Sequence, residues 1–336
     1  MHKHIARMGV SAVAAVALSG LGVTGAGASG PAAKAAGPAL VQSAKTAHAS
    51  ATPGAQLWAS RYSGSVNGQD EPFSMAVSPD GATVYVTGIS TGASSGLDYA
   101  TVAYSAGTGA QLWVKRYNGP ANSGDSALSV AVSPNGRKVV VTGASSGINY
   151  PDSSKGADYA TIAYNAATGA QLWVKRYNGP AKDYDSARSV TVGPSSAVVY
   201  VTGISTGTTT GSDYATIAYN AGTGAKLWVS RYNGQANSED DTYSVAVSPD
   251  GQTVYVTGGS ANIPPTNTGI YRDYATVAYS STTGVPLWTS LYNGPANGDD
   301  FAITMAVSPA TGTVYVTGQS DGTNTGPDYA TVAYQG

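Results

Sequence analysis

The chain has 336 residues with 43 glycines, 23 tyrosines and only 2 phenylalanines, a composition typical of many short strands joined by glycine turns. Its formal charge of −2 and its scattered Lys and Arg residues predict no nucleic-acid partner, because phosphate binding needs clustered basic groups. The chain contains no cysteine, and its 3 histidines all precede residue 54. Disulfides, His or Cys zinc sites, and Ser-His-Asp or Cys-His catalysis are therefore excluded from the repeat region.

The first 28 residues have the three-part pattern of a secretory signal peptide. A basic start ends at Arg7, an apolar run covers residues 10–23, and small residues precede the expected cleavage after Ala28. The apolar run is interrupted and short for a membrane span, so we expect a secreted, extracellular mature chain without a membrane span. Residues 29–53 are rich in Ala, Ser and Pro and predict a flexible leader.

From residue 54 onward the sequence is built from a repeat. Each copy contains four strand-like segments, exemplified by LWVKRYNG, SVAVSPDG, VYVTG and DYATVAY, which are separated by turn residues. Four strands per copy is the content of one propeller blade. The LW pair marks the five copies at Trp58, Trp113, Trp173, Trp228 and Trp288.

The tryptophans are predicted to pack between blades. Period-two alternation in LWVKRY places Trp113 and Tyr117 on one face of the strand, where they can contact the next sheet. Burying a large apolar side chain contributes roughly 1.5–3 kcal/mol, so five such contacts would be a major part of the stability. A stripe of sugar-binding tryptophans is the alternative, but repetition in every blade favours packing.

The two ends of the repeat region complement each other. Residues 54–62 supply an outermost strand alone, while the chain ends at Tyr334 after three strands of a last copy. Joining them would remove two exposed sheet edges. The sequence therefore predicts an all-β fold: a monomeric five-bladed β-propeller of four-stranded blades over residues 54–336, closed by the N-terminal strand pairing with the C-terminal blade.

The repeat DYATVAY, TG, LWVKRYNG, AVSPDG, VYVTG resembles the SBBP-type and YVTN-type β-propeller repeats of bacteria. The segment AATGAQLWVKRYNG, residues 166–179, is similar to the tryptophan-docking motif of the quinoprotein-like propellers. The resemblance covers residues 54–336 and implies a propeller, but propellers host unrelated activities. Quinoprotein dehydrogenases have eight blades and a vicinal cysteine pair, whereas this chain has five copies and no cysteine, so no quinone cofactor is expected.

One aspartate recurs before the innermost strand of every blade, where the loops should surround the propeller axis. Such a residue can cap its loop by accepting backbone N–H bonds, or pair with Arg61, Arg116, Arg176 or Arg231. Alternatively, grouped carboxylates at the mouth bind a ligand or Ca²⁺, which prefers oxygen ligands. The recurring aspartates are Asp70, Asp125, Asp185, Asp240 and Asp300. The candidate calcium ligands are Asp183, Asp185, Asp240, Asp241, Asp299 and Asp300.

A second series of aspartates begins the third strand of each copy and is interpreted as structural. Its members are Asp98, Asp158, Asp213, Asp273 and Asp328. The loop before this strand is longer in the second and fourth copies, where it carries Tyr150 in one and Tyr271 and Arg272 in the other. Such loop residues often contact ligands, so these three are candidate binding residues, although tolerated insertions would look the same.

The sequence favours a secreted, non-catalytic binding or scaffold protein that engages an extracellular glycan, peptide or protein, or a cell-wall component, on the face carrying these loops. Near-identical blades leave little room for an asymmetric catalytic site. The alternative is a carboxylate-dependent glycoside hydrolase, by resemblance to five-bladed glycosidases of the arabinanase type. Such an enzyme needs two carboxyl groups with separated acid and base roles. Its candidate acids would be Asp70, Asp185, Asp240, Asp300 and Glu239.

Overall fold

The structure, a computed structural model, describes residues 52–147, 156–262 and 271–336. Within these ranges all regular secondary structure is β, in 19 strands, which confirms the all-β class. The described residues include no helix that could cross a bilayer. The signal peptide and nearly all of the leader predicted above lie outside the described residues. The strands are β1 (Asp70–Val77), β2 (Thr83–Thr91), β3 (Leu97–Ser105), β4 (Gln111–Tyr117), β5 (Asp125–Val132), β6 (Lys138–Ser146), β7 (Ala157–Asn165), β8 (Gln171–Tyr177), β9 (Asp185–Val192), β10 (Val198–Thr206), β11 (Ser212–Asn220), β12 (Lys226–Tyr232), β13 (Asp240–Val247), β14 (Thr253–Asn262), β15 (Tyr271–Ser280), β16 (Pro286–Tyr292), β17 (Asp300–Val307), β18 (Val314–Gly322) and β19 (Gly326–Tyr334).

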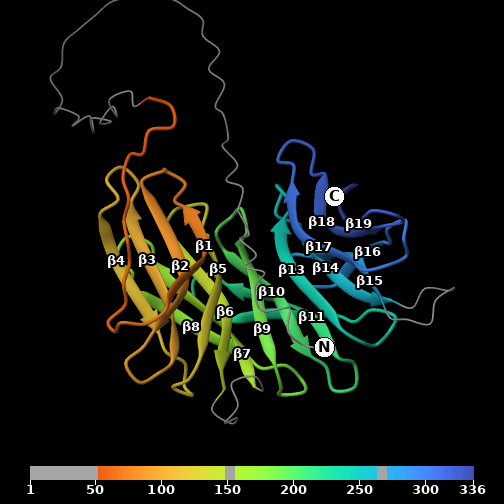
Figure 1. Cartoon of the computed structure of the whole chain (residues 1–336), viewed down its shortest axis with the longest axis horizontal. Helices are drawn as coiled ribbons and strands as arrows, with labels where there is room; N and C mark the ends of the chain where they lie inside the picture. Colours follow the sequence, from red (N-terminus) through yellow and green to blue (C-terminus); the bar gives the residue numbers. More distant parts are fainter. Residues whose placement is uncertain (1–51, 148–155, 263–270) are drawn as a thin grey trace, which may run out of the picture.

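The strands form five antiparallel sheets that follow the sequence repeat. Four sheets are four-stranded meanders, β1–β4, β5–β8, β9–β12 and β13–β16, and the fifth holds β17, β18 and β19. The first strands of successive sheets, β1, β5, β9, β13 and β17, contact one another in turn and therefore line the centre of the assembly. Figure 1 shows the sheets following one another in an arc, from the first (orange) to the fifth (blue).

The turn between the third and fourth strands positions the tryptophan of the preceding blade. In the second sheet this turn ends at Gly169, whose φ of 67° is in the left-handed region that glycine adopts easily. A Cβ atom at Gly169 would lie 2.8 Å from the Trp113 ring, so the glycine also makes room for that ring. Trp113 then donates its indole N–H to the Ala166 carbonyl oxygen at 2.9 Å. The recurring TG turn is therefore a docking surface for the recurring LW strand.

The hydrophobic core lies between blades. Each of its four clusters combines side chains from two neighbouring sheets, such as Tyr99 and Trp113 with Val139 and Ile162. Trp173 and Trp228 repeat the indole hydrogen bond to the next blade, at 3.1 and 2.9 Å. The prediction that tryptophans pack against a neighbouring blade is confirmed at these three junctions.

The N-terminal segment lies on the first blade. Residues 54–62 form no strand, and the structure finds no closed sheet, so the pairing with β19 expected from the sequence is not shown. Trp58 instead donates its indole N–H to the Ala106 carbonyl oxygen at 2.8 Å, and its ring stacks on Tyr104. The physical reason is that an outermost strand makes its main side-chain contacts with the following blade, and these contacts form without strand pairing.

Candidate functional site

The aspartates that begin the innermost strands act as loop caps. In every blade one carboxylate oxygen accepts the N–H of a glycine six residues earlier, as Asp185 does from Gly179 at 2.6 Å. Four of the five side chains are fully buried, so these carboxylates do not line an open mouth. Burial raises the pKa of Asp185 to about 6, against the opposing effect of the glycine N–H. The capping aspartates are Asp70, Asp125, Asp185, Asp240 and Asp300.

The calcium hypothesis gains no geometric support from these residues. Within the described ranges, no three His, Cys, Asp or Glu side chains lie close enough together to hold a metal ion. Asp183 caps its own loop by accepting the Tyr184 N–H at 2.9 Å. Asp299 accepts the Arg272 backbone N–H at 3.1 Å.

The arginines of the outermost strands pair with the second aspartate series, not with the first. Arg116 contacts Asp98 at 2.8 Å, Arg176 contacts Asp158 at 2.8 Å, and Arg231 contacts Asp213 at 2.7 Å. These pairs lie within one sheet, on adjacent strands, which supports the structural interpretation of the second series. Pairing with the first series, one of the sequence-based alternatives, does not occur in these blades, because each arginine is held by the aspartate on the adjacent strand of its own sheet.

The innermost strands carry residues that differ from blade to blade. In β5, β9, β13 and β17 the second and fourth positions flank a buried third position, and all of them except Ser186 are half-exposed. A register shift leaves the fourth residue bulged in every blade. The glycine of VYVTG permits this close approach, since a Cβ atom at Gly143 would lie 1.9 Å from the Ser126 carbonyl oxygen. The second positions are Glu71, Ser126, Ser186, Asp241 and Phe301, and the fourth are Phe73, Leu128, Arg188, Tyr243 and Ile303.

In blades three to five, several of these residues lie close to the side chain of Arg272. Arg272, at the start of β15, donates to Glu239 and lies 3.6 Å from an Asp241 carboxylate oxygen. Its guanidinium also covers the Phe301 ring, with 5.4 Å between the guanidinium carbon and the ring centroid. We call Arg188, Asp241, Tyr243 and Arg272 the axial cluster.

Electrostatics link the four members of the axial cluster. Burial raises the pKa of Asp241, while the Arg272 and Arg188 charges oppose this shift. Burial also raises the pKa of Tyr243, and the Asp241 charge adds to that effect. Asp241 and Tyr243 therefore lie within electrostatic reach of both guanidinium groups.

Sequence reasoning found part of this group. Of the predicted binding residues, Arg272 belongs to the axial cluster and Tyr271 pairs with Asn262 beside it, whereas Tyr150 lies outside the described residues. Arg188 and Tyr243 were missed because they do not recur. Aligning the five copies and reading the variable positions of the innermost strand would have found them.

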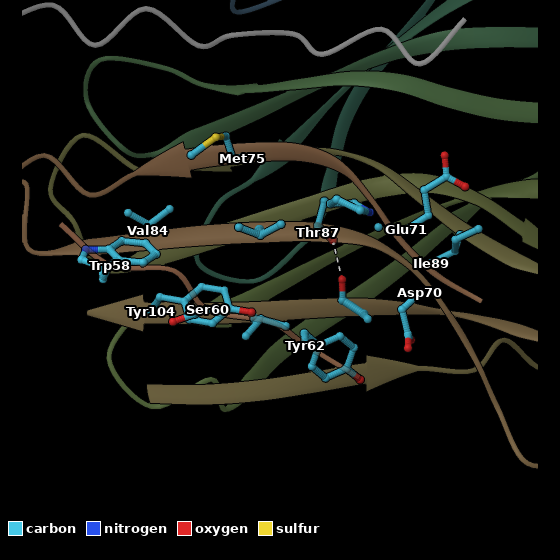
Figure 2. Close-up of a pocket in the computed structure, with 15 residues that line it drawn as sticks. Trp58, Ser60, Tyr62, Asp70, Glu71, Met75, Val84, Thr87, Ile89 and Tyr104 are labelled. Carbon is cyan, nitrogen blue, oxygen red and sulfur yellow. Dashed lines mark hydrogen bonds between the residues drawn. The ribbon is translucent and has the colours of Figure 1, made fainter. Parts of the chain in front are cut away.

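A groove lies on the first blade, between residues 58–62 and the sheet β1–β4. Figure 2 shows Trp58, Tyr62 and Tyr104 on one side of it and Met75 and Val84 on the other. Its volume is about 270 Å³, and most of its lining is apolar. In the second blade the equivalents of Met75 and Val84 are buried against the blade before it. The groove is therefore one half of a blade junction that lacks its other half.

The axial residues do not fit the quinone cofactor of the quinoprotein dehydrogenases. That cofactor is a polycarboxylate and needs unpaired cations. Arg272 is already paired with the Glu239 and Asp241 carboxylates, and Arg188 lies within electrostatic reach of Asp241. The chain also has no cysteine to supply the vicinal pair.

Solved structures share the fold. Hydrazine synthase from Kuenenia stuttgartiensis has a TM-score of 0.50 and 16% identity, over 73% of this chain and 61% of that chain. The β-propeller domain of the Trilobed protease from Pyrococcus furiosus has a TM-score of 0.47 and 8% identity, over 78% of this chain and 69% of that domain. Saccharomyces cerevisiae Sqt1 has a TM-score of 0.48 and 12% identity, over 80% and 61%. The chain thus spans about three fifths of the hydrazine synthase chain, and identities this low speak only for the fold.

A family model matches the chain as well, although no curated protein does. The matched residues, 158–331, run from the second blade into the last strand of the fifth. They make up more than half of the 336 residues. The chain therefore belongs to the β-propeller family PQQ_2, which is described as outer membrane protein assembly factor BamB.

Proposed function

We propose that this chain is a secreted, non-catalytic β-propeller scaffold that binds an extracellular glycan, peptide or protein at the centre of its innermost strands. The observation that carries the proposal is the division of the repeat. Positions that pack blades together recur in each copy, whereas the positions that face the centre differ from blade to blade. A surface that varies on a constant framework is typical of a binding site.

Two further features support a scaffold. The family description names an assembly factor, a role that rests on contact rather than turnover. Three of the acids that a glycoside hydrolase would use, Asp185, Asp240 and Asp300, are fully buried and hold loop N–H groups. They cannot protonate a substrate from those positions.

The proposal includes ring closure, with residues 54–62 as the outermost strand of the fifth blade. It also includes the SBBP and YVTN type for the five repeats. The segment already makes the contacts of an outermost strand. Arg116 donates to the Tyr62 hydroxyl at 3.3 Å, as Arg176 donates to Tyr117 and Arg231 to Tyr177. The segment is not paired with a sheet, and β19 is the edge strand of the three-stranded fifth sheet. Pairing the two would complete that sheet.

The test is a paired screen with the mature chain, residues 29–336. Immobilised glycans, cell-wall fragments and peptides report binding, and a reducing-end assay on the same polysaccharides reports hydrolysis. We expect saturable binding without release of reducing ends. Reducing-end release would support the glycoside hydrolase alternative, and no binding to any probe would contradict the scaffold proposal.

A further inference from the structure

Among the described residues, 14 buried side-chain polar atoms have no hydrogen-bond partner, and three of them lie outside the recurring aspartate and tyrosine positions. They are Ser186 Oγ, Arg188 Nε and Arg272 Nε. Ser186 and Arg188 lie two residues apart on β9, where Arg188 is the bulged residue. Buried polar atoms are almost always hydrogen-bonded in native proteins, so three such atoms in one region point to a polar ligand or bound water.

Both signs of charge meet in this region. Arg188 and Arg272 supply positive charge, and Asp241, Glu239 and Asp299 supply negative charge. An anionic ligand would be repelled by the carboxylates and a cationic ligand by the guanidinium groups. A neutral ligand with many hydroxyl groups has no such penalty, because each hydroxyl can donate to a carboxylate and accept from a guanidinium.

Tyr243 adds an apolar surface and a hydroxyl to the same region. It occupies the bulged position of β13 and is half-buried. The Phe301 ring is covered by Arg272, so Tyr243 is the aromatic ring of the cluster left to stack on a ligand. The equivalent positions in the second and fifth blades hold Leu128 and Ile303, which confines the polar character to the third and fourth blades.

We propose that the axial cluster, with Ser186 and Glu239, binds a neutral saccharide. This inference rests on the proposed binding function and names its ligand class. Asp241 and Glu239 accept hydrogen bonds from sugar hydroxyls, Arg188 and Ser186 donate to them, and Tyr243 stacks on the sugar ring. Two contacts orient the Asp241 carboxylate for this role. Ser212 Oγ lies 3.5 Å from one oxygen, and an Arg272 guanidinium nitrogen lies 3.6 Å from the other.

The experiment measures binding of neutral gluco-, xylo-, malto- and chito-oligosaccharides to the mature chain by calorimetry. We expect Tyr243→Ala and Arg188→Ala each to weaken binding about 10-fold or more. Leu128→Ala, at the equivalent position of the second blade, is the matched control and should leave affinity unchanged. Thermal melting of each variant confirms folding, and Arg188→Lys replaces Arg188→Ala where the latter does not fold.

Asp241→Asn separates the saccharide class from other ligands. Removing one negative charge should shift preference toward oligosaccharides that carry uronic acids. Binding that does not respond to Tyr243 or Arg188 would overturn the inference and leave the scaffold proposal standing. Binding of peptides or of anionic glycans alone would overturn the saccharide class, and binding of no probe would overturn both proposals.

Discussion

The junctions between blades and the two end faces of the arc are built from equivalent residues of the repeat. These residues are buried in the junctions and exposed at the ends. At the first junction Tyr99 is 1% exposed and donates to the Ala160 carbonyl oxygen, whereas its counterpart Tyr329 on the fifth blade is 98% exposed. On the other side of the junction, Met75 of the first blade is 56% exposed, and its counterpart Val130 in the second blade is 2% exposed. A repeat therefore encodes both halves of a junction in every blade, and the ends carry halves without partners.

The two end faces are the two halves of one further junction. Within the first blade Tyr99 pairs with Tyr117 and Ala103 with Trp113. By the same register Tyr329 would pair with Tyr62 and Ala333 with Trp58. The groove of Figure 2 would then receive Tyr329 as the second blade receives Tyr99.

Replacing a tryptophan inside the arc or at its end gives the largest expected effect. Trp173→Ala removes a buried ring and its hydrogen bond to Ala221, and should lower the free energy of unfolding by about 3–5 kcal/mol. If the ring closes, Trp58→Ala should approach the same loss, as measured by denaturant unfolding. A loss well below that of Trp173→Ala would indicate that the end stays open and that Trp58 keeps only its contacts with Ala106 and Tyr104.

A disulfide tests the register of the end pairing directly, because the chain has no native cysteine. Ala59→Cys with Val332→Cys occupies the position of the Val102–Val114 pair of the first blade. We expect an intrachain bond that stabilises the protein by about 2–4 kcal/mol. Each single cysteine variant is the control, and non-reducing electrophoresis distinguishes the outcomes. Cross-linked dimers would show that a second copy fills the groove.

The internal junctions were predictable from sequence, because each element of them recurs. Trp113, Trp173 and Trp228 each pack on the TG turn of the next blade, and the recurrence of the LW pair predicted that packing. The aspartate caps were also predictable in kind. The partner of each arginine was not, because period-two alternation predicts the face of a side chain but not which of two neighbouring carboxylates the arginine contacts.

The ends and the axial cluster were harder to predict for different reasons. Repeat pairing predicted a strand for residues 54–62, but the side-chain contacts of Trp58 with the first blade do not require that pairing. The axial cluster has no recurring signal, since only one of the five copies has Arg at the fourth position of the innermost strand and only one has Tyr there. Both residues occupy the bulge of an innermost strand, and no turn residue in the sequence predicts that bulge.

Substitutions of charged residues compare an ion pair inside the arc with the equivalent pair of residues at its ends. Arg176→Ala leaves Asp158 buried without its partner and should cost about 2–3 kcal/mol. Arg61 and Asp328 hold the equivalent positions at the end. In a closed ring, Arg61→Asp should destabilise by about 1 kcal/mol, and adding Asp328→Arg should restore most of the loss. Independent, additive effects in this double-mutant cycle would speak against contact between the two residues.

The pH dependence of stability gives the smallest effect and separates a buried junction carboxyl from an exposed one. Burial raises the pKa of Asp185 to about 6, whereas an unfolded aspartate titrates near 3.9. Between these values the folded state holds more protons, so the free energy of unfolding should fall as pH rises through the window, by on the order of 1–2 kcal/mol. Asp185→Asn should flatten that slope. Asp80, in an exposed turn of the first blade, has a pKa lowered by its bond from Ser78. Asp80→Asn should therefore leave the slope above pH 4 unchanged, and equal effects of the two variants in urea unfolding at pH 4–7 would contradict the assignment.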